Sequence, residues 1–162
     1  MRGEPPEVAV IAAGAPHSAA IADLHRRCFD EAWSRPTVRQ VFAMPGAFGL
    51  LAVSGAGNGA EANPLGFALC RRAADECELL SLAVLPEWRG RGIGKALLAA
   101  AIARAREAGA RRLFLEVAED NVAAQRLYQA FRFRPVGRRP GYYRRLGAPA
   151  VAALTFALAF EG

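Results

Sequence analysis

Apolar residues recur along the chain with two periods, and the change from one to the other predicts the order of the elements. Strand-like runs lie at Val8–Ala12, Phe48–Val53, Leu65–Arg71, Glu78–Leu85, Arg112–Val117 and Val151–Phe160. Helical spacing is found at Ser18–Phe29, from Pro36 to Phe42, at Gly92–Ala108 and at Asn121–Phe131. A glycine-rich stretch, 54–60, separates the second and third strands and predicts a hairpin with a flexible loop. Strands therefore come first as hairpins and later alternate with helices.

This order predicts one α/β (α+β) domain over residues 1–162, with a mixed, mostly antiparallel sheet and helices on both faces. The run Glu78–Leu85 is almost wholly apolar, so we expect a central strand covered on both sides. The longest apolar stretch, Ala148–Phe160, is shorter than the roughly 20 residues of a membrane helix. Glu4 and Glu7 stand where a secretory leader carries positive charge. We therefore expect a cytoplasmic protein with no membrane partner, and with residues 1–6 flexible.

Basic residues outnumber acidic ones by 21 to 15, which gives a net charge of +6, although Lys95 is the only lysine. Such a balance favours anionic ligands, but an arginine-rich composition would produce it without any partner. The three cysteines, Cys28, Cys70 and Cys77, lack the paired spacing of metal sites and disulfide frameworks. We therefore predict buried thiols and no metal.

The segment Arg89–Lys95 reads Arg-Gly-Arg-Gly-Ile-Gly-Lys and lies between a predicted strand and a predicted helix. Glycines allow a close approach of the backbone, and the N–H groups at a helix start attract phosphate. A Walker loop is excluded because Ala96 follows the lysine, and a Rossmann turn because Lys95 takes the place of the third glycine. A turn that merely starts the helix is the simpler alternative, but it needs neither three glycines nor three cations.

The turn resembles the Arg-x-x-Gly-x-Gly loop of the GCN5-related acetyltransferase superfamily, which cradles the diphosphate of acetyl-CoA. Leu82–Trp88 resembles the strand that leads into this loop, and Leu115–Asn121 with Leu127–Tyr128 extends the likeness over roughly residues 76–145. The resemblance implies acetyl-CoA as cosubstrate, with no metal. The cofactor-binding residues that it implies are Leu82, Ala83, Val84, Arg89, Gly90, Arg91, Gly92, Ile93, Gly94, Lys95 and Asn121.

The end of the chain, with Phe133, Arg139 and Tyr142–Tyr143, resembles the RimI-type N-terminal-alanine acetyltransferases. This resemblance implies a protein or peptide N-terminus as acceptor, possibly that of a ribosomal protein. It implies Glu116 as proton acceptor and Tyr128 as proton donor, and an acceptor site formed by Trp33, Tyr142 and Tyr143. Arg132 stands where the family usually has glycine, and a left-handed arginine costs about 1 kcal/mol. We therefore expect the preceding helix to end differently here.

The residues themselves support these roles but leave alternatives open. Glu116 lies between Leu115 and Val117 on a predicted interior strand, where a carboxylate is unusual unless it is solvated or paired with an arginine such as Arg112. Tyr128 follows Asn121 by two helical turns, so both project from nearly the same face. A buried structural tyrosine is the alternative for Tyr128, and core packing for Tyr142 and Tyr143.

Six acidic residues stand near the ends of strands that we expect to be neighbours: Asp75, Glu76, Glu78, Glu116, Glu119 and Asp120. They predict an acidic mouth that attracts a cationic amine, next to a basic mouth for the cofactor. Two other functions fit parts of the chain. A small-molecule amine acetyltransferase keeps the cofactor and changes the acceptor. A nucleic-acid-binding module fits less well, because the arginines are spread out and no recognised motif is present, so we expect no nucleic-acid partner.

Overall fold

The computed structural model describes residues 7–55, 62–145 and 147–161. Residues 1–6 and most of the glycine-rich loop, both predicted to be flexible, lie outside the described residues. The described strands form one seven-stranded sheet in the order β1-β2-β3-β4-β5-β7-β6, and β4 and β5 are its parallel pair. Their bounds are β1 (Val8–Ala13), β2 (Ala47–Ser54), β3 (Asn63–Ala73), β4 (Glu76–Val84), β5 (Arg112–Ala118), β6 (Arg134–Arg145) and β7 (Ala148–Ala159). The predicted mixed, mostly antiparallel sheet is confirmed.

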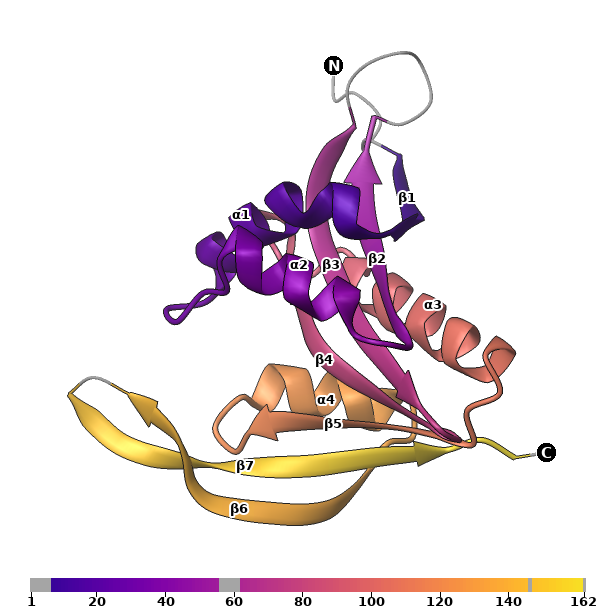
Figure 1. Cartoon of the computed structure of the whole chain (residues 1–162). Helices are drawn as coiled ribbons and strands as arrows, with labels where there is room; N and C mark the ends of the chain where they lie inside the picture. The colour runs from indigo at the N-terminus through magenta and orange to yellow at the C-terminus, as the bar shows by residue number, and fades with distance from the viewer. Residues whose placement is uncertain (1–6, 56–61, 146, 162) are drawn as a thin grey trace.

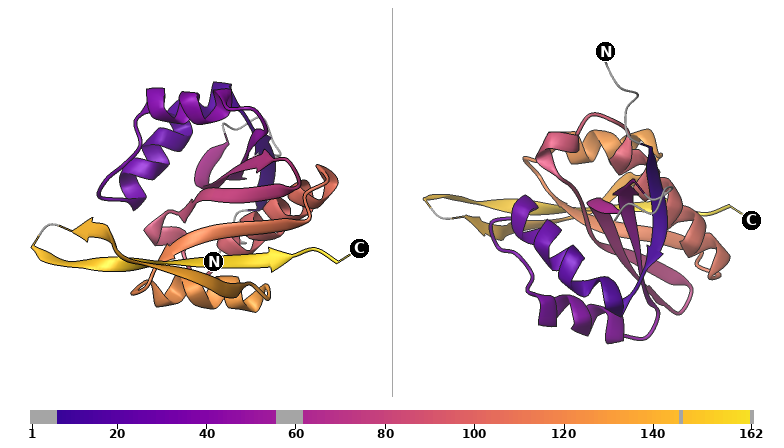
Figure 2. Two further views of the ribbon diagram at one scale, coloured as in Figure 1. Left: turned by 60° about the horizontal axis from the view of Figure 1, so that its bottom comes forward. Right: turned by 90° about the horizontal axis from the view of Figure 1, so that it is seen from above.

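Helices cover both faces of this sheet, as predicted (Figures 1 and 2). Helices α1 (Ser18–Cys28) and α2 (Arg35–Ala43) lie on one face, and α3 (Ile93–Glu107) and α4 (Val122–Ala130) on the other. Short 3-10 turns, η1 (Ala15–His17) and η2 (Pro86–Trp88), precede α1 and the glycine turn. None of the helices in the described chain is both long enough and apolar enough to span a membrane.

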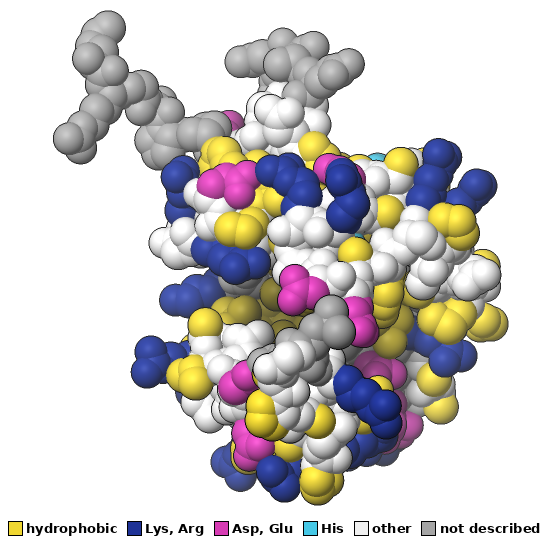
Figure 3. Space-filling model, turned by 90° about the vertical axis from the view of Figure 1, so that its left-hand side faces the viewer, with side chains coloured by type: hydrophobic (Ala, Val, Ile, Leu, Met, Phe, Trp, Pro, Cys, Tyr) yellow, Lys and Arg dark blue, Asp and Glu magenta, His cyan; other side chains and the backbone are white. Residues whose placement is uncertain are grey.

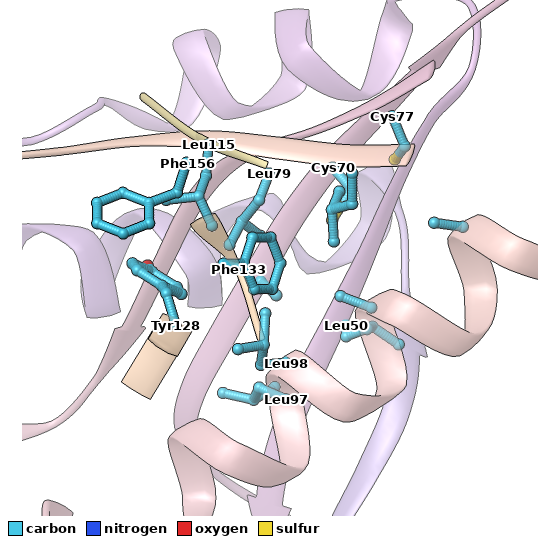
Figure 4. Close-up of a cluster of buried hydrophobic side chains, with 14 of the residues drawn as sticks. Leu50, Cys70, Cys77, Leu79, Leu97, Leu98, Leu115, Tyr128, Phe133 and Phe156 are labelled. Atoms are coloured by element: carbon cyan, nitrogen blue, oxygen red, sulfur yellow. The ribbon is translucent and has the colours of Figure 1, made fainter. Parts of the chain in front are cut away.

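Two hydrophobic cores hold the helices to the sheet. The α3–α4 core is shown in Figure 4, where Leu97 and Leu98 of α3 lie below the strands and Tyr128 of α4 lies beside Phe156. The α1–α2 core contains Ile21 and Val38 against the buried Phe67. Along β5, Leu113, Leu115 and Val117 are buried in the α3–α4 core, and the residues between them are more exposed. This alternation agrees with the strand predicted at Arg112–Val117. Phe114 and Glu116 therefore face the α1–α2 side.

Strand β4 is the central strand, as predicted, but the expectation that it is covered on both faces is wrong at its second half. Leu80, Ser81 and Leu82 are half-buried, whereas Ala83 and Val84 are buried. The reason is that β5 no longer lies beside β4 at that point. The apolar side chains of this half therefore border a space that the sheet leaves open.

Strand β6 was not among the predicted elements. It has Pro135 and Pro140, together with Gly137 and Gly141, and these residue types are depleted in strands. Its pairing with β7 shifts register at three points, which accommodates the prolines at an edge of the sheet. The strand forms because the apolar run of β7, which starts at Ala148 and not at Val151, offers a long partner.

The end of α4 corrects a second expectation. Arg132 has a φ of +69°, so the helix ends in the left-handed conformation that glycine usually provides. The Phe133 N–H donates to the Tyr128 carbonyl at 3.1 Å, and the Arg132 N–H to the Gln129 carbonyl at 2.9 Å. These two bonds form a Schellman cap, and Phe133 enters the core beside Tyr128, with ring centroids 5.8 Å apart. The buried phenylalanine fixes the cap geometry, and the arginine adopts it at a cost.

Arg132→Gly should therefore stabilise the fold. Removing the left-handed side chain gains about 1 kcal/mol, and the greater freedom of glycine in the unfolded chain offsets part of this gain. We expect a net increase of about 0.5 kcal/mol in the free energy of unfolding, measured by urea denaturation. Gln129→Gly is the control, because glycine inside the same helix should cost about 1 kcal/mol. A loss of stability in Arg132→Gly would contradict this account.

Candidate active site

A gap between β4 and β5 dominates the centre of the sheet. The two strands pair over Glu76–Leu79 and Arg112–Leu115, and then separate. Strand β4 continues beside β3 as far as Val84, while β5 continues beside β7 as far as Ala118. Figure 1 shows the strands diverging toward the left, with α4 behind the opening. The sheet thus opens at its middle into a slot with one strand on each side.

The edge of β4 that borders this slot carries backbone hydrogen-bonding groups. The Leu85 N–H donates to the Leu65 carbonyl at 2.9 Å. Because inward and outward groups alternate along an antiparallel strand, the N–H and C=O groups of Leu82 and Val84 point away from β3. The Val84 carbonyl accepts from Arg89 Nε at 2.9 Å and from the Cys28 thiol at 3.6 Å. Leu82 and Val84 therefore offer the edge that an extended, amide-containing ligand would pair with.

The glycine turn lies directly beyond this edge. Gly90 and Gly92 have φ values of +76° and +83°, which strain any residue with a side chain. At either glycine, a Cβ would have no other described residue within 4 Å apart from its chain neighbours. The backbone is therefore open to a ligand. The Ala96 N–H is the first in α3 to donate within the helix, to Gly92 at 3.0 Å.

The N–H groups of residues 93–95 therefore have no hydrogen-bond partner inside the helix. Gly92 is the N-cap residue and has no side chain that could accept a bond from them. These three donors point out of a fifteen-residue helix at its positive end. A diphosphate fits this cradle. Lys95 is exposed beside it, whereas the Ile93 side chain is buried in the core and contributes its backbone alone.

The other residues predicted to bind the cofactor occupy distinct positions. Arg91 stacks over the Trp88 ring, with the guanidinium carbon 4.6 Å from the ring centroid. Arg89 points its Nε at the strand edge and not at the cradle. Gly94 packs against Leu127 of α4. Asn121 caps α4, with its side-chain oxygen accepting the Ala124 N–H at 3.1 Å, so its amide nitrogen is the group available to a ligand.

Glu116 borders the slot from β5. Its side chain retains 22% exposure, and its Oε1 lies 3.4 Å from Arg139 Nε. The sequence had offered Arg112 as an example of an arginine partner, but Arg112 pairs with Glu76 at 2.7 Å instead. Arg139 also stacks over Tyr142 at 5.5 Å. The carboxylate is therefore held by one exposed arginine of β6, a strand that the sequence analysis missed.

Glu78 was counted in the acidic cluster without a catalytic role, and the structure places it on the same face as Glu116. Glu78 pairs with Phe114 across the parallel ladder, two residues from Glu116. Burial raises the pKa of Glu78, and the negative charge of Glu116 raises it further. The positive charges of Arg71 and Arg139 lower it by less. One signal for this position was present in the sequence: Glu78 is a carboxylate between Cys77 and Leu79, two apolar residues that are buried in the structure.

Tyr128 belongs to the α3–α4 core, on the opposite face of the sheet from Glu116. The side chain is 7% exposed and its ring lies 6.5 Å from that of Phe156. Burial raises the pKa of Tyr128 to about 12, with a smaller contribution from Tyr143. Burial also raises the pKa of Tyr143, and Glu116 adds to it. The charges of Tyr143 and Glu116 therefore bear on groups that belong to opposite faces of the sheet.

Among the described residues, Trp33 has no contact with this set of carboxylates and tyrosines, whereas Tyr142 joins it through Arg139 and Tyr143. Trp33 packs on His25 and lines a recess of about 410 Å³ with Ala22 and Arg35. Tyr142 is 51% exposed on β6, where it meets Tyr143 edge to face at 5.1 Å. Figure 3, viewed toward the tip of the β6–β7 hairpin, shows a hollow above the hairpin with hydrophobic side chains on its floor and acidic ones beside it.

The predicted acidic mouth is smaller than expected. Because β4 and β5 are parallel, Glu76 pairs with the start of β5 and Glu119 follows its end, roughly 23 Å away at 3.3 Å per residue. Arg138 pairs with Glu119 at 3.1 Å, and Arg111 lies 4.0 Å from Asp75. Glu78 and Glu116 are the two carboxylates that interact near the slot. Among the described side chains, no group of three or more His, Cys, Asp or Glu could hold a metal ion.

A parallel pair that separates ahead of a glycine turn is the arrangement expected of an acetyltransferase fold, and the family comparison agrees. Residues 18–133 match the model of the acetyltransferase (GNAT) family, and the chain belongs to that family. The resemblance drawn from the motifs is thereby confirmed.

Among individual proteins, the chain is similar to the ribosomal protein bS18 alanine N-acetyltransferase of Haemophilus influenzae. The two are 42% identical over 79 residues, 49% of this chain and 53% of the relative. The enzyme of the same name from Escherichia coli K12 is 36% identical over 77 residues, 48% of this chain and 52% of the relative. The match thus spans about half the length of the curated relatives.

Solved structures show the same fold over nearly the whole chain. The ribosomal-protein-S18-alanine N-acetyltransferase of Escherichia coli superposes with a TM-score of 0.84 at 25% identity, covering 96% of this chain and 97% of that one. NAA60 of Arabidopsis thaliana, in complex with acetyl-CoA, superposes with a TM-score of 0.81 at 21% identity, covering 96% and 100%.

The glycine cradle can be tested with a pair of variants that differ in charge alone. Gly92→Asp and Gly92→Asn both introduce a short side chain that tolerates the left-handed conformation, but the aspartate puts a negative charge at the cradle. We expect Gly92→Asp to weaken binding of coenzyme A, measured by calorimetry, at least about tenfold more than Gly92→Asn does, since 1.4 kcal/mol of repulsion suffices. Equal affinities in the two variants would show that the diphosphate binds elsewhere.

Proposed function

We propose that the chain is an acetyl-CoA-dependent N-acetyltransferase that acetylates the N-terminal α-amine of a protein. The preferred acceptor in this proposal is an N-terminal alanine, as on a ribosomal protein. The observation that carries this proposal is the separation of β4 from β5, which leaves a strand edge at Leu82 and Val84 directly before the open glycine turn. The names of the bacterial relatives support the choice of acceptor.

Acetyl-CoA supplies a thioester, in which an activated acetyl carbon is bonded to a thiolate leaving group. The backbone of Leu82 and Val84 is suited to pair with the amides of its extended arm, as an added strand would. The Val84 carbonyl, which accepts from Arg89 Nε, would be one of the groups that pair with these amides. Residues 90–95 would hold the diphosphate, and Lys95 would supply positive charge nearby.

Glu116 is proposed to accept the proton of the attacking amine. An α-ammonium has a pKa of about 7.7–8.0, so a sizeable fraction is already neutral near pH 7, and a modest base acting directly or through one water suffices. Glu78 adds a second carboxylate on the same face. The pair supplies the local negative charge that a cationic N-terminus needs on a chain with a net charge of +6.

Tyr128 is proposed to donate to the leaving sulfur. With its pKa raised to about 12, the hydroxyl stays protonated at any physiological pH. An ordinary thiol has a pKa of about 8.5, so a complete transfer from Tyr128 to a thiolate is uphill by roughly 5 kcal/mol. The hydroxyl therefore acts mainly as a buried hydrogen-bond donor to the developing negative charge, and any proton that it does give up is replaced from the amine or from solvent.

The acceptor is tested with a panel of peptides that differ in the first residue, assayed beside free amines. The proposal predicts turnover of acetyl-CoA with Ala-initiated peptides, slower turnover when the first residue is bulky, and none when the α-amine is blocked. A blocked peptide that contains an internal lysine is the control for side-chain acetylation. Turnover with polyamines, amino acids or aminoglycosides, and none with peptides, would contradict the protein acceptor and favour a small-molecule amine acetyltransferase.

The two proposed catalytic side chains are separated by the pH dependence of their variants. Glu116→Gln should lower turnover by roughly 10²–10⁴-fold near neutral pH and recover partly above pH 8, where the amine is already neutral. Tyr128→Phe should lower turnover at every pH, because the loss of a hydroxyl on the sulfur side is not compensated by a neutral amine. Steady-state rates between about pH 6 and pH 10 measure both effects.

Glu119→Gln is the matched control for Glu116→Gln, because Glu119 also pairs with an arginine but lies beyond the end of β5. It should retain wild-type turnover. Acetyl-CoA affinity should remain near wild type in Glu116→Gln, which acts on the acceptor. Near-wild-type rates in both Glu116→Gln and Tyr128→Phe across the pH range would overturn both assignments.

A further inference from the structure

The loop between α1 and α2, residues 29–34, is held by a histidine that has no role in the proposed chemistry. His25 lies in the last turn of α1 and is 4% exposed. Its Nδ1 accepts the backbone N–H of Trp33 at 3.0 Å, across eight residues of chain. This bond ties the far end of the loop back to the helix from which the loop starts.

Three aromatic rings surround the imidazole. Trp33 stacks on it at 4.8 Å with an interplanar angle of 14°, Phe29 lies at 4.4 Å, and Phe67 at 5.8 Å. Phe67 belongs to β3 and is fully buried, so the imidazole connects the loop with the sheet. The loop is thus fixed both by a hydrogen bond to its backbone and by packing of its tryptophan.

The hydrogen bond defines the protonation state of the ring. A nitrogen that accepts a bond carries no proton, so the imidazole is neutral and its proton is on Nε2. Burial lowers the pKa of His25, which favours this neutral form.

The loop lies on the side of the molecule where the hollow opens. Figure 1 and the left view of Figure 2 agree that the loop lies on the same side of the molecule as the tip of the β6–β7 hairpin, toward which β4 and β5 diverge. The base of the loop is tied to the end of β4, because the Cys28 thiol donates to the Val84 carbonyl and Arg27 pairs with Glu87 at 2.8 Å. Figure 3 shows the hollow on this side.

We propose that His25 is a positioning residue for the acceptor: it fixes the backbone of Trp33 and so shapes the wall against which the acceptor N-terminus binds. The inference rests on the proposed function, in which an amine-bearing chain enters this hollow. His25 then determines how well the acceptor binds, whereas the cofactor, held by β4 and the glycine cradle, is unaffected by it.

Three variants separate the hydrogen bond from the aromatic packing. His25→Phe keeps a ring but loses the acceptor, and His25→Asn places an oxygen where Nδ1 was but loses the ring. His17→Phe is the matched control, because it removes an equivalent bond, in which His17 Nδ1 accepts the Gly14 N–H at 3.1 Å, outside the loop. Amide hydrogen exchange at Trp33 reports on the bond itself. Steady-state kinetics with an Ala-initiated peptide, and calorimetry with acetyl-CoA, report on the two substrates.

In His25→Phe we expect faster exchange at Trp33 and a KM for the peptide that rises about tenfold, the upper end of what one neutral hydrogen bond supplies. Acetyl-CoA affinity should stay within about twofold of wild type, a change of less than 0.5 kcal/mol. His25→Asn should recover part of both losses, and it carries the test if His25→Phe does not fold. His17→Phe should resemble the wild type in both kinetic measurements.

Unchanged exchange at Trp33 in His25→Phe would overturn the proposal, and so would faster exchange with a wild-type KM for the peptide. An equal loss of acetyl-CoA affinity would mean a general structural role and would also overturn it. If the wild-type protein acetylates no peptide, the proposed function fails separately. The same KM comparison is then made with whichever amine is turned over, and a wild-type KM in His25→Phe again overturns the positioning role.

Discussion

Strands β4 and β5 share a parallel ladder over four residue pairs, Glu76–Leu79 with Arg112–Leu115, and then follow different partners. The first four strands form one antiparallel unit, and β5, β7 and β6 form another. Beyond the separation each of the two strands keeps an edge that the other no longer covers, and on β4 this edge carries the backbone groups of Leu82 and Val84. The ligand edge therefore follows from this early separation.

In the proposed function, the separation would let side chains from opposite faces of the sheet reach one bound ligand. In a continuous sheet, Tyr128 on the α3–α4 side and Glu116 on the α1–α2 side would be isolated from each other by backbone. Here Tyr143 contributes to the raised pKa of Tyr128, and Glu116 to that of Tyr143. A buried hydroxyl that holds its proton and a carboxylate with 22% exposure thus differ in solvation because they belong to different faces, and this difference suits one to donate and the other to accept.

Most of the fold could be predicted because its strands and helices carry their own periodicity. Strand β5 alternates, α3 has an apolar stripe, and the glycine turn stands at a strand–helix junction. Strand β6 could not be predicted, because its prolines and arginines are tolerated only through pairing with β7. The same holds for the site, in which the motif marks Glu116 and Tyr128. The pairing of Glu116 with Arg139 depends on β6, and the proximity of Glu78 depends on the register between β4 and β5. His25 carried no signal, since one histidine on a helix face has many explanations.

The chain bears its positive charge almost entirely on arginine, and its one lysine, Lys95, stands in the first turn of α3 beside the anion cradle. A guanidinium remains protonated under all physiological conditions and has no lone pair with which to attack a thioester. With its charge in this form, the chain has a single lysine side chain, that of Lys95, whose amine could attack an acetyl thioester. The preference for arginine therefore leaves few side-chain amines to compete with an acceptor amine.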